Sequence, residues 1–238
     1  MTSGPVSAYL RETFIEVHHF NLARRYDLLQ EPLCSLCSAP LSGDEEGADP
    51  NLCWICTYYD DLYGFEQAFA MSPYVKGKKS DLQKDIHQKY YGKKPGSRRL
   101  GVALALFVNE RLPALRDAEA IVPAPIHSET LAERGFNQSE FIAEEVGGLL
   151  GIPVRADVLQ KIRKGAQMEL SSREERRENV RGMYTYRPFD KPPRLVLLID
   201  DIMASGFTAA ECSQQIVNAG AQSVYALVAG RNVFVEGE

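Results

Sequence analysis

Residues 196–208 read Val196-Leu197-Leu198-Ile199-Asp200-Asp201-Ile202-Met203-Ala204-Ser205-Gly206-Phe207-Thr208, and this stretch decides the fold. Four consecutive apolar residues predict a buried strand. Small residues at 204–206 predict a tight loop, and a helix is predicted over 208–218. A strand that leads through a short loop into a helix is the repeating unit of a parallel sheet.

The predicted loop has the properties of a phosphate site. Side chains at 204–206 are small enough for an anion to approach the main chain, and the hydroxyls of Ser205 and Thr208 can add hydrogen bonds. Free N–H groups and the positive dipole end of the helix favour an anion. Asp200 and Asp201 are acceptors that suit the vicinal hydroxyls of a ribose. The alternative is an ordinary turn in which Asp201 and Ser205 cap the helix.

The complete pattern resembles the phosphoribosyl pyrophosphate (PRPP) loop of type I phosphoribosyltransferases. It lacks the glycine fingerprint of dinucleotide-binding folds and the Gly-Lys-Ser/Thr of a P-loop. The resemblance implies that PRPP binds with Mg²⁺, and that Asp200 and Asp201 serve as the catalytic pair. It places PRPP contacts at Asp200, Asp201, Ala204, Ser205, Gly206, Phe207 and Thr208.

Four cysteines near the N-terminus form a second pattern. Cys34 and Cys37 are separated by two residues, as are Cys53 and Cys56, and fifteen residues lie between the pairs. This spacing is typical of a tetrathiolate zinc site, and four protein ligands make a structural role the expectation. Disulfides or redox motifs are the alternative, disfavoured because no apolar signal segment precedes the cysteines. The fifth cysteine, Cys212, is expected to be a buried apolar residue of the helix.

Composition places the chain among soluble proteins. It has 238 residues, 45% of them hydrophobic, and no apolar run of membrane-spanning length, so we expect no membrane insertion and a cytoplasmic location. The net charge of −5, from 27 basic and 32 acidic residues, gives no global signal for nucleic-acid binding. Such binding would require a local basic patch.

One basic stretch, residues 76–99, is a candidate for that patch. Tyr90 and Tyr91 interrupt it and could stack on the bases of single-stranded DNA. The alternative is a solvated helix surface, which is the usual outcome for a run of charges. The candidate nucleic-acid contacts are Lys78, Lys79, Lys93, Lys94, Arg98 and Arg99.

Strand and helix patterns alternate from residue 118 onward and predict an α/β fold with a parallel sheet. Strands are expected at 120–122, 194–199 and 224–228, and helices at 140–150 and 208–218. Helices are also expected at 80–91 and 100–115, and near the N-terminus within 6–30. We divide the chain into an N-terminal helical extension (1–32), a zinc ribbon (33–57), a connecting helical and basic segment (58–117) and a phosphoribosyltransferase-like domain (118–238).

Two further motifs make the resemblance more specific. They are Val122-Pro123-Ala124-Pro125 with Arg134-Gly135-Phe136-Asn137-Gln138, and the segment Gln167-x2-Leu170-Ser171-x2-Glu174-x-Arg176-Arg177-x-Asn179-Val180-Arg181-Gly182. With the cysteine pattern, they are similar to the ComF family of competence proteins over roughly residues 28–231. That family combines a four-cysteine zinc ribbon with a type I phosphoribosyltransferase-like domain.

The basic residues of these motifs allow two interpretations. Arg134, Lys164 and Arg176 are candidates to contact pyrophosphate or to close over the ligand. Alternatively, Asn137 is a helix N-cap within a plausible turn. The arginines around Arg176 would then lie on a solvated helix that is capped by Ser172, where they pair with Glu174, Glu175 and Glu178. Both interpretations stay open at the level of sequence.

The function that the resemblance implies is phosphoribosyl binding or transfer with Mg²⁺, in DNA uptake or natural transformation and alongside a helicase-like partner. An enzyme would transfer phosphoribose from PRPP to an unknown acceptor, as in nucleobase salvage. The alternative is a non-catalytic protein that binds single-stranded DNA or a nucleotide. The two differ in ligand, since DNA bound through 76–99 would show a steep salt dependence.

Overall fold

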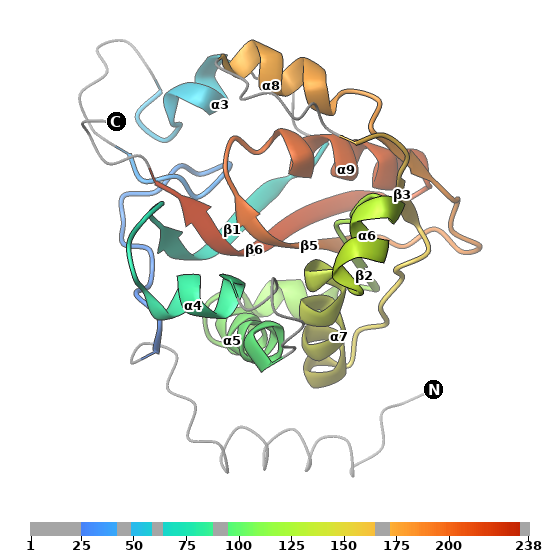
Figure 1. Ribbon diagram of the computed structural model, residues 1–238, viewed down its shortest axis with the longest axis horizontal. Coiled ribbons are helices and arrows are strands. Elements are labelled where there is room, and N and C mark those ends of the chain that lie inside the picture. The colour runs from blue at the N-terminus through green and yellow to red at the C-terminus, as the bar shows by residue number, and fades with distance from the viewer. Residues whose placement is uncertain (1–24, 42–48, 59–63, 88–94, 165–171, 234–238) are drawn as a thin grey trace.

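The computed structural model describes residues 25–41, 49–58, 64–87, 95–164 and 172–233. At its centre is a four-stranded sheet in the order β1-β6-β5-β2, in which all neighbours are parallel (Figure 1). The strands are β1 (Gln67–Tyr74), β2 (Ala120–Pro123), β5 (Leu195–Met203) and β6 (Ser223–Asn232). The predicted α/β class with a parallel sheet is confirmed.

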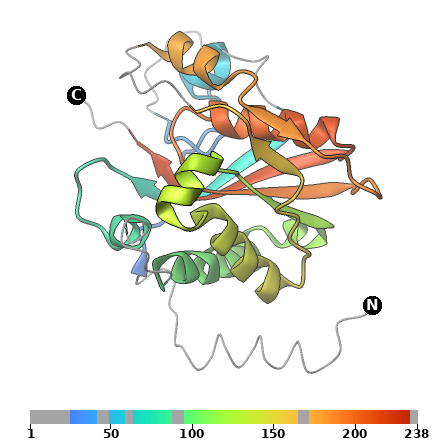
Figure 2. The same cartoon turned by 45° about the vertical axis from the view of Figure 1, so that its right-hand side comes forward.

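Helices cover both faces of the sheet, as the turned view in Figure 2 makes clear. One face carries α4 (Asp81–His87), α5 (Pro95–Arg111) and α7 (Gln138–Leu150). The other carries α9 (Phe207–Asn218), with α3 (Trp54–Tyr58), α8 (Arg173–Val180) and the antiparallel pair β3 (Leu159–Lys161) and β4 (Tyr184–Tyr186) around it. The 3₁₀ helix η3 (Pro113–Asp117) precedes β2, and α6 (Ser128–Arg134) follows it.

The apolar run of β5 is buried from both sides. Val196 and Leu198 pack into the core beneath α9, whereas Leu197 and Ile199 pack into the core beneath α5 and α7. All four are at most 1% exposed. Alternate side chains of a strand point to opposite faces, so a strand covered on both faces needs a continuous apolar run. This explains why the run at 196–199 carries no polar residue.

Several element boundaries differ from the predicted ones. β5 ends at Met203 rather than at residue 199, so Asp200 and Asp201 lie within the strand. The extension arises because the β5–β6 pairing continues as far as Met203 opposite Arg231. The helix predicted at 100–115 is α5, which ends at Arg111 because a new 3₁₀ helix begins at Pro113. The strand predicted at 120–122 and the helix predicted at 140–150 are present with boundaries shifted by at most two residues.

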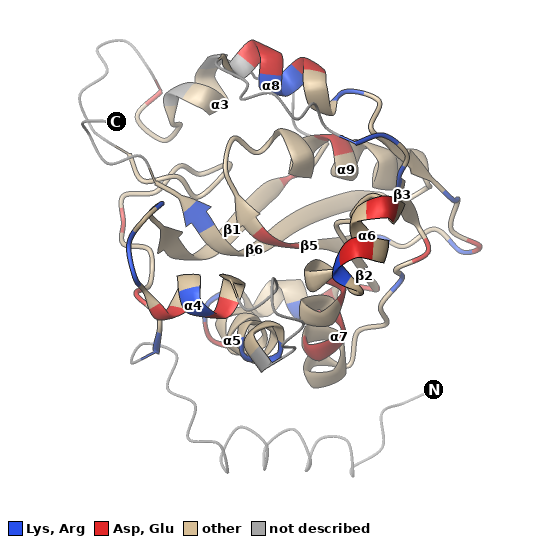
Figure 3. Ribbon diagram, in the orientation of Figure 1, with Lys and Arg blue, Asp and Glu red and all other residues tan. Residues whose placement is uncertain are grey.

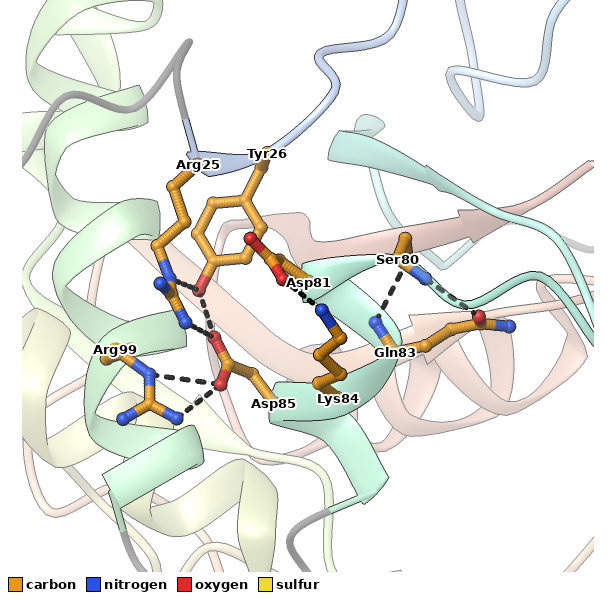
Figure 4. A network of polar contacts seen from close by, with 8 residues as sticks. All are labelled: Arg25, Tyr26, Ser80, Asp81, Gln83, Lys84, Asp85 and Arg99. Carbon is orange, nitrogen blue, oxygen red and sulfur yellow. Dashed lines mark hydrogen bonds and ion pairs between the residues drawn. The ribbon is translucent and has the colours of Figure 1, made fainter.

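The predicted N-terminal helix lies mostly outside the described residues, and the chain enters the structure at Arg25. A buried carboxylate, Asp85 of α4, holds this entry point (Figure 4). It accepts hydrogen bonds from Arg25 Nη2 at 2.8 Å and from the Tyr26 hydroxyl at 2.7 Å. Arg99 of α5 donates from Nε to the other carboxylate oxygen at 3.0 Å and also pairs through Nη2. One carboxylate thus joins the N-terminal segment, α4 and α5.

Candidate functional site

The loop between β5 and α9 leads into the helix through a glycine. Gly206 is the N-cap residue of α9 with φ of 87°, and it has no side chain that could cap the helix. The N-cap position is therefore occupied by Gly206 and by neither Asp201 nor Ser205. A positive φ is readily adopted by glycine alone, which explains Gly206 at this point. The first N–H groups of α9 receive no hydrogen bond from an N-cap side chain, and the N-terminus of a helix favours an anion.

Asp200 is held at the carboxyl edge of the sheet by two donors. Ser139 of α7 donates its hydroxyl to Asp200 Oδ1 at 2.8 Å, and the backbone N–H of Asp201 donates to the same oxygen at 2.8 Å. Both aspartates are half-buried. The N-terminus of α7 and the end of β5 therefore meet at one place, although 61 residues separate Ser139 from Asp200.

The Arg-Gly-Phe-Asn motif builds the turn before α7. Asn137 accepts a hydrogen bond from the Ser139 N–H at 3.2 Å, so the helix-cap interpretation is confirmed. Its Nδ2 also donates to the Ala124 carbonyl at 3.0 Å, and the Ala124 N–H donates to Ile199 at 2.8 Å. A single buried asparagine thus connects the Val-Pro-Ala-Pro segment, α7 and β5. Arg134 is exposed in the last turn of α6.

A cavity of about 400 Å³ opens between α6 and the β3 strand. Its volume lies in the range typical of small-molecule sites. Its lining includes His127, Arg134, Lys161 and Lys164, and one acid, Glu133. Lys164 pairs with Glu129 at 2.5 Å and lies 3.8 Å from Glu133. The predicted pyrophosphate contacts Arg134 and Lys164 are therefore brought together, while Arg176 is exposed on α8, outside this lining.

Lys161 lines this cavity, and the charge of Asp200 influences its pKa. Burial lowers the pKa of Lys161, while the negative charge of Asp200 acts in the opposite direction. Its ammonium also lies 5.4 Å from the ring centre of Tyr184. Burial raises the pKa of Tyr184. Cys212 is completely buried beside them, as predicted, and burial raises the pKa of its thiol.

The four N-terminal cysteines form a cluster. Their sulfur atoms all lie within 4.8 Å of one another, with Cys37 and Cys53 3.6 Å apart and Cys53 and Cys56 3.5 Å apart. None of them forms a disulfide. Tetrahedral coordination with Zn–S distances of 2.3 Å would place sulfurs about 3.8 Å apart. The cluster can hold a metal ion and is compatible with zinc in a structural, four-thiolate site.

Arg231, at the end of β6, contacts this cluster from the sheet. Its Nη2 lies 3.4 Å from Cys37 Sγ. The contact with Cys34 and burial raise the pKa of the Cys37 thiol, but the contacts with Cys53 and Cys56 and the Arg231 charge outweigh them and lower it to about 7. A thiol that ionises easily is a better metal ligand, because the thiolate is the binding form.

The basic stretch at 76–99 is divided by the fold. Lys78 and Lys79 are exposed in the loop after β1, and Figure 3 shows basic residues along this loop. Arg98 pairs with Glu145 of α7 at 2.8 Å, and Arg99 pairs with Asp85. Lys93, Lys94 and the two tyrosines lie outside the described residues. Arg98 is exposed and Arg99 is half-buried. Both arginines form intramolecular ion pairs, so a phosphate would have to compete for both of them.

The alternative of a capped surface helix for residues 173–180 is confirmed. Ser172 and Glu175 form a reciprocal capping box at the start of α8, with hydrogen bonds of 3.1 Å in each direction. At its other end, Arg163 donates to the carbonyls of Asn179 and Arg181 at 3.0 and 2.9 Å. Arg176 thus belongs to a helix with its own stabilising contacts.

Sequence patterns missed Ser139, Lys161 and Arg231. Each is a lone polar residue, and only packing places them against Asp200, the cavity and the cysteine cluster. Ser139, directly after the Arg-Gly-Phe-Asn-Gln segment, could have been included by extending that motif by one residue.

None of the helices in the described part of the chain combines the length and the apolar character that a membrane span requires.

These features define an α/β protein with a parallel sheet, an acidic strand end beside a short loop that leads into a helix, and a cluster of four cysteines. The chain is 25% identical over 123 residues to Competence protein F of Haemophilus influenzae, covering 51% of this chain and 54% of that protein. It is 27% identical over 136 residues to the DNA utilization protein YhgH of Salmonella typhi, covering 54% and 60%. These relatives confirm the predicted similarity to the ComF family, although the chain spans only about half their length. No family model matches the chain.

Proposed function

We propose that this protein binds a phosphoribosyl ligand, such as PRPP with Mg²⁺, at the carboxyl edge of its sheet. The observation that carries the proposal is the start of α9 at a glycine N-cap, a few residues after the two aspartates of β5. In open α/β folds, ligands bind at the carboxyl ends of the strands. Within the proposed domain 118–238, we therefore assign the phosphate and the ribose diol of the ligand to the short segment 200–208.

Each part of the segment has a chemical role in this proposal. Residues 204–208 hold the 5′-phosphate through main-chain N–H groups and the Ser205 hydroxyl. Asp200 and Asp201 accept hydrogen bonds from the ribose hydroxyls and stabilise positive charge that develops on the ring during transfer. Mg²⁺, when bound, neutralises the negative charge of the pyrophosphate.

The neighbouring cavity is suited to the pyrophosphate end of the ligand. Three cations, Arg134, Lys161 and Lys164, outnumber the single carboxylate in its lining. The charge of Asp200 acts to raise the pKa of Lys161, so a residue of the cavity lining interacts electrostatically with the end of β5. Arg176 of α8 would contact the ligand only if that helix moved toward the cavity.

The biological setting follows from the relatives. One is named a competence protein and another a DNA utilization protein. We therefore place phosphoribosyl binding in competence or DNA uptake, where a helicase-like protein is the expected partner. The proposal includes transfer from PRPP to an acceptor and assigns no particular acceptor.

Calorimetric titration of PRPP with Mg²⁺ tests the site. The wild type should show saturable binding, and the Asp200→Asn, Asp201→Asn variant should show none while keeping the unfolding midpoint of the wild type. The control is Asp117→Asn with Asp190→Asn, which removes the same charge from two exposed positions that precede strands. Binding that survives in the first variant, or is lost equally in the control, would contradict the proposal.

A second candidate function, binding of single-stranded DNA, is favoured by the exposure of Lys78 and Lys79. Both lie in the loop after β1, at the same edge of the sheet as Asp200. Phosphate contacts by lysines weaken steeply as salt increases. Replacement of both lysines by alanine should lower DNA affinity and flatten its salt dependence, whereas PRPP binding should be unchanged. DNA affinity that is insensitive to salt would exclude this function.

A further inference from the structure

Arg231 links the cysteine cluster to the phosphate loop. The residue lies one position before the end of β6, opposite Met203, the last residue of β5, and it is only 2% exposed. Its Nη1 donates to the Met203 carbonyl at 3.0 Å and also to the Ala204 carbonyl. Its Nη2 lies 3.4 Å from Cys37 Sγ. One guanidinium therefore contacts both the first residues of the loop and one of the four thiols.

The charge of Arg231 requires a partner inside the protein. A guanidinium remains protonated in proteins, and a buried cation without an anionic partner is strongly unfavourable. Within the part of the chain that the structure describes, its hydrogen bonds go to two carbonyls and one sulfur, and no carboxylate pairs with it. A divalent metal held by four thiolates has a net charge of −2, so a metal-loaded cluster supplies the missing anion.

The contacts between Arg231 and the loop also fix the orientation of the loop backbone. Carbonyls of Met203 and Ala204 accept from Arg231, which fixes the orientation of the peptide groups just before Gly206. These peptide groups set the path by which the chain reaches Gly206, the N-cap residue of α9. A change in Arg231 would therefore alter the position of the N–H groups offered to an anion.

We propose that Arg231 is a positioning residue through which metal binding by the four cysteines orders the phosphate loop. The metal centre then has a role beyond stabilising the N-terminal ribbon, because loss of the metal loosens residues 203–208. The inference concerns the site of the proposed function, but the coupling can be measured without any phosphoribosyl ligand. If zinc stabilises only the N-terminal ribbon, the order of residues 203–208 should not change when the metal is removed.

The first experiment compares amide hydrogen exchange in the zinc-loaded and chelator-stripped full-length protein. Stripping should increase exchange in residues 203–208 and leave residues 142–150 of α7, on the opposite face of the sheet, unchanged. Equal protection of the loop in both forms would overturn the proposal. Faster exchange in α7 and the loop alike would also overturn it, because it would indicate general unfolding instead of coupling.

The second experiment removes the link. In Arg231→Met, loop exchange should already be high with zinc bound, and zinc affinity measured by competition with a chelator should fall about 10- to 100-fold, as for other partners of metal ligands. Arg231→Lys keeps the charge but cannot reach all three acceptors, and it should show intermediate loop exchange. Arg194→Met, at the start of β5, is the matched control and should behave as wild type in both measurements.

Three results would count against the link. Wild-type loop protection in Arg231→Met would refute a positioning role. Unchanged zinc affinity in that variant would refute the charge argument. If Arg231→Met does not fold, Arg231→Lys replaces it, and loop exchange in Arg231→Lys equal to that of the wild type would refute the proposal. None of these outcomes depends on whether PRPP binds.

Discussion

Ser139 donates its hydroxyl to Asp200 Oδ1 at 2.8 Å, and this bond joins the first turn of α7 to the end of β5. The Asp201 N–H donates to the same oxygen, so one carboxylate oxygen of Asp200 has two donors. Two elements that lie far apart in the sequence therefore orient the first of the two candidate catalytic carboxylates.

We expect Ser139→Ala to weaken Mg²⁺–PRPP binding about 10-fold, or ~1.4 kcal/mol, because Asp200 loses one of its two orienting donors. Isothermal titration calorimetry measures the change. Ser223→Ala removes a hydroxyl hydrogen bond of the same 2.8 Å length at the other end of the sheet and should leave binding unchanged. Equal affinity in Ser139→Ala and wild type would show that the bond does not orient the carboxylate.

Gly206→Ala should lower the free energy of unfolding by about 1–2 kcal/mol, because its φ of 87° is unfavourable for a residue with a Cβ. Gly148→Ala is the contrasting variant. Gly148 lies inside α7 and an added Cβ would meet nothing within 4 Å, so alanine should raise stability by about 0.5–1 kcal/mol. Urea denaturation of both variants gives the two values. The same sign for both substitutions would contradict the assigned backbone conformations.

Asp85→Asn should destabilise the protein by about 2–4 kcal/mol, since two arginine charges lose their shared buried partner. This range is below that of a fully buried pair because the side chains of Arg25 and Arg99 are each 33% exposed. Asp81→Asn breaks the exposed pair with Lys84 on the same helix and should cost less than about 0.5 kcal/mol. Thermal or urea unfolding distinguishes the two. If both variants lost a similar amount of unfolding free energy, the hydrogen bonds of Asp85 would contribute little to stability.

Cys34→Ser should reduce the bound zinc and lower the unfolding midpoint, because a structural metal contributes folding free energy. Metal content by mass spectrometry and urea unfolding report both effects. The control is Cys212→Ser, which changes a buried cysteine outside the cluster and should keep the metal content of the wild type. Undiminished zinc in Cys34→Ser would exclude the four-cysteine site.

Stability should decrease as the pH rises above about 10, partly because of Tyr184. Burial raises the pKa of Tyr184 in the folded state, so the folded protein keeps a proton that the unfolded chain releases. The stabilisation is present below the unfolded pKa and is lost as the pH increases. Tyr184→Phe should reduce this slope by up to about 1.4 kcal/mol per pH unit between pH 10 and 11. Tyr186→Phe, at an exposed position of the same strand, is the control, and equal slopes in the two variants would rule out Tyr184 as the titrating group.

Short-range patterns determined much of what the sequence could predict. The strand, loop and helix around residues 196–208 and the cap at Asn137 depend on neighbouring residues, so their local chemistry is visible in the chain. The cysteine pairs were predicted because a metal site imposes short and recognisable spacings. The end of β5 was misplaced because it depends on pairing with β6, which lies beyond the next helix.

The sequence by itself determined the parallel α/β class and the cysteine cluster, and it predicts a phosphate loop after β5. Tertiary structure alone decided that Ser139 orients Asp200, that Lys161 lines the cavity within the electrostatic influence of Asp200, and that Arg231 joins the loop to Cys37. These contacts connect residues 61 and 194 positions apart in two of the three cases. A side chain's partner at such separation is set by strand order and helix packing, and no local pattern in the chain encodes it.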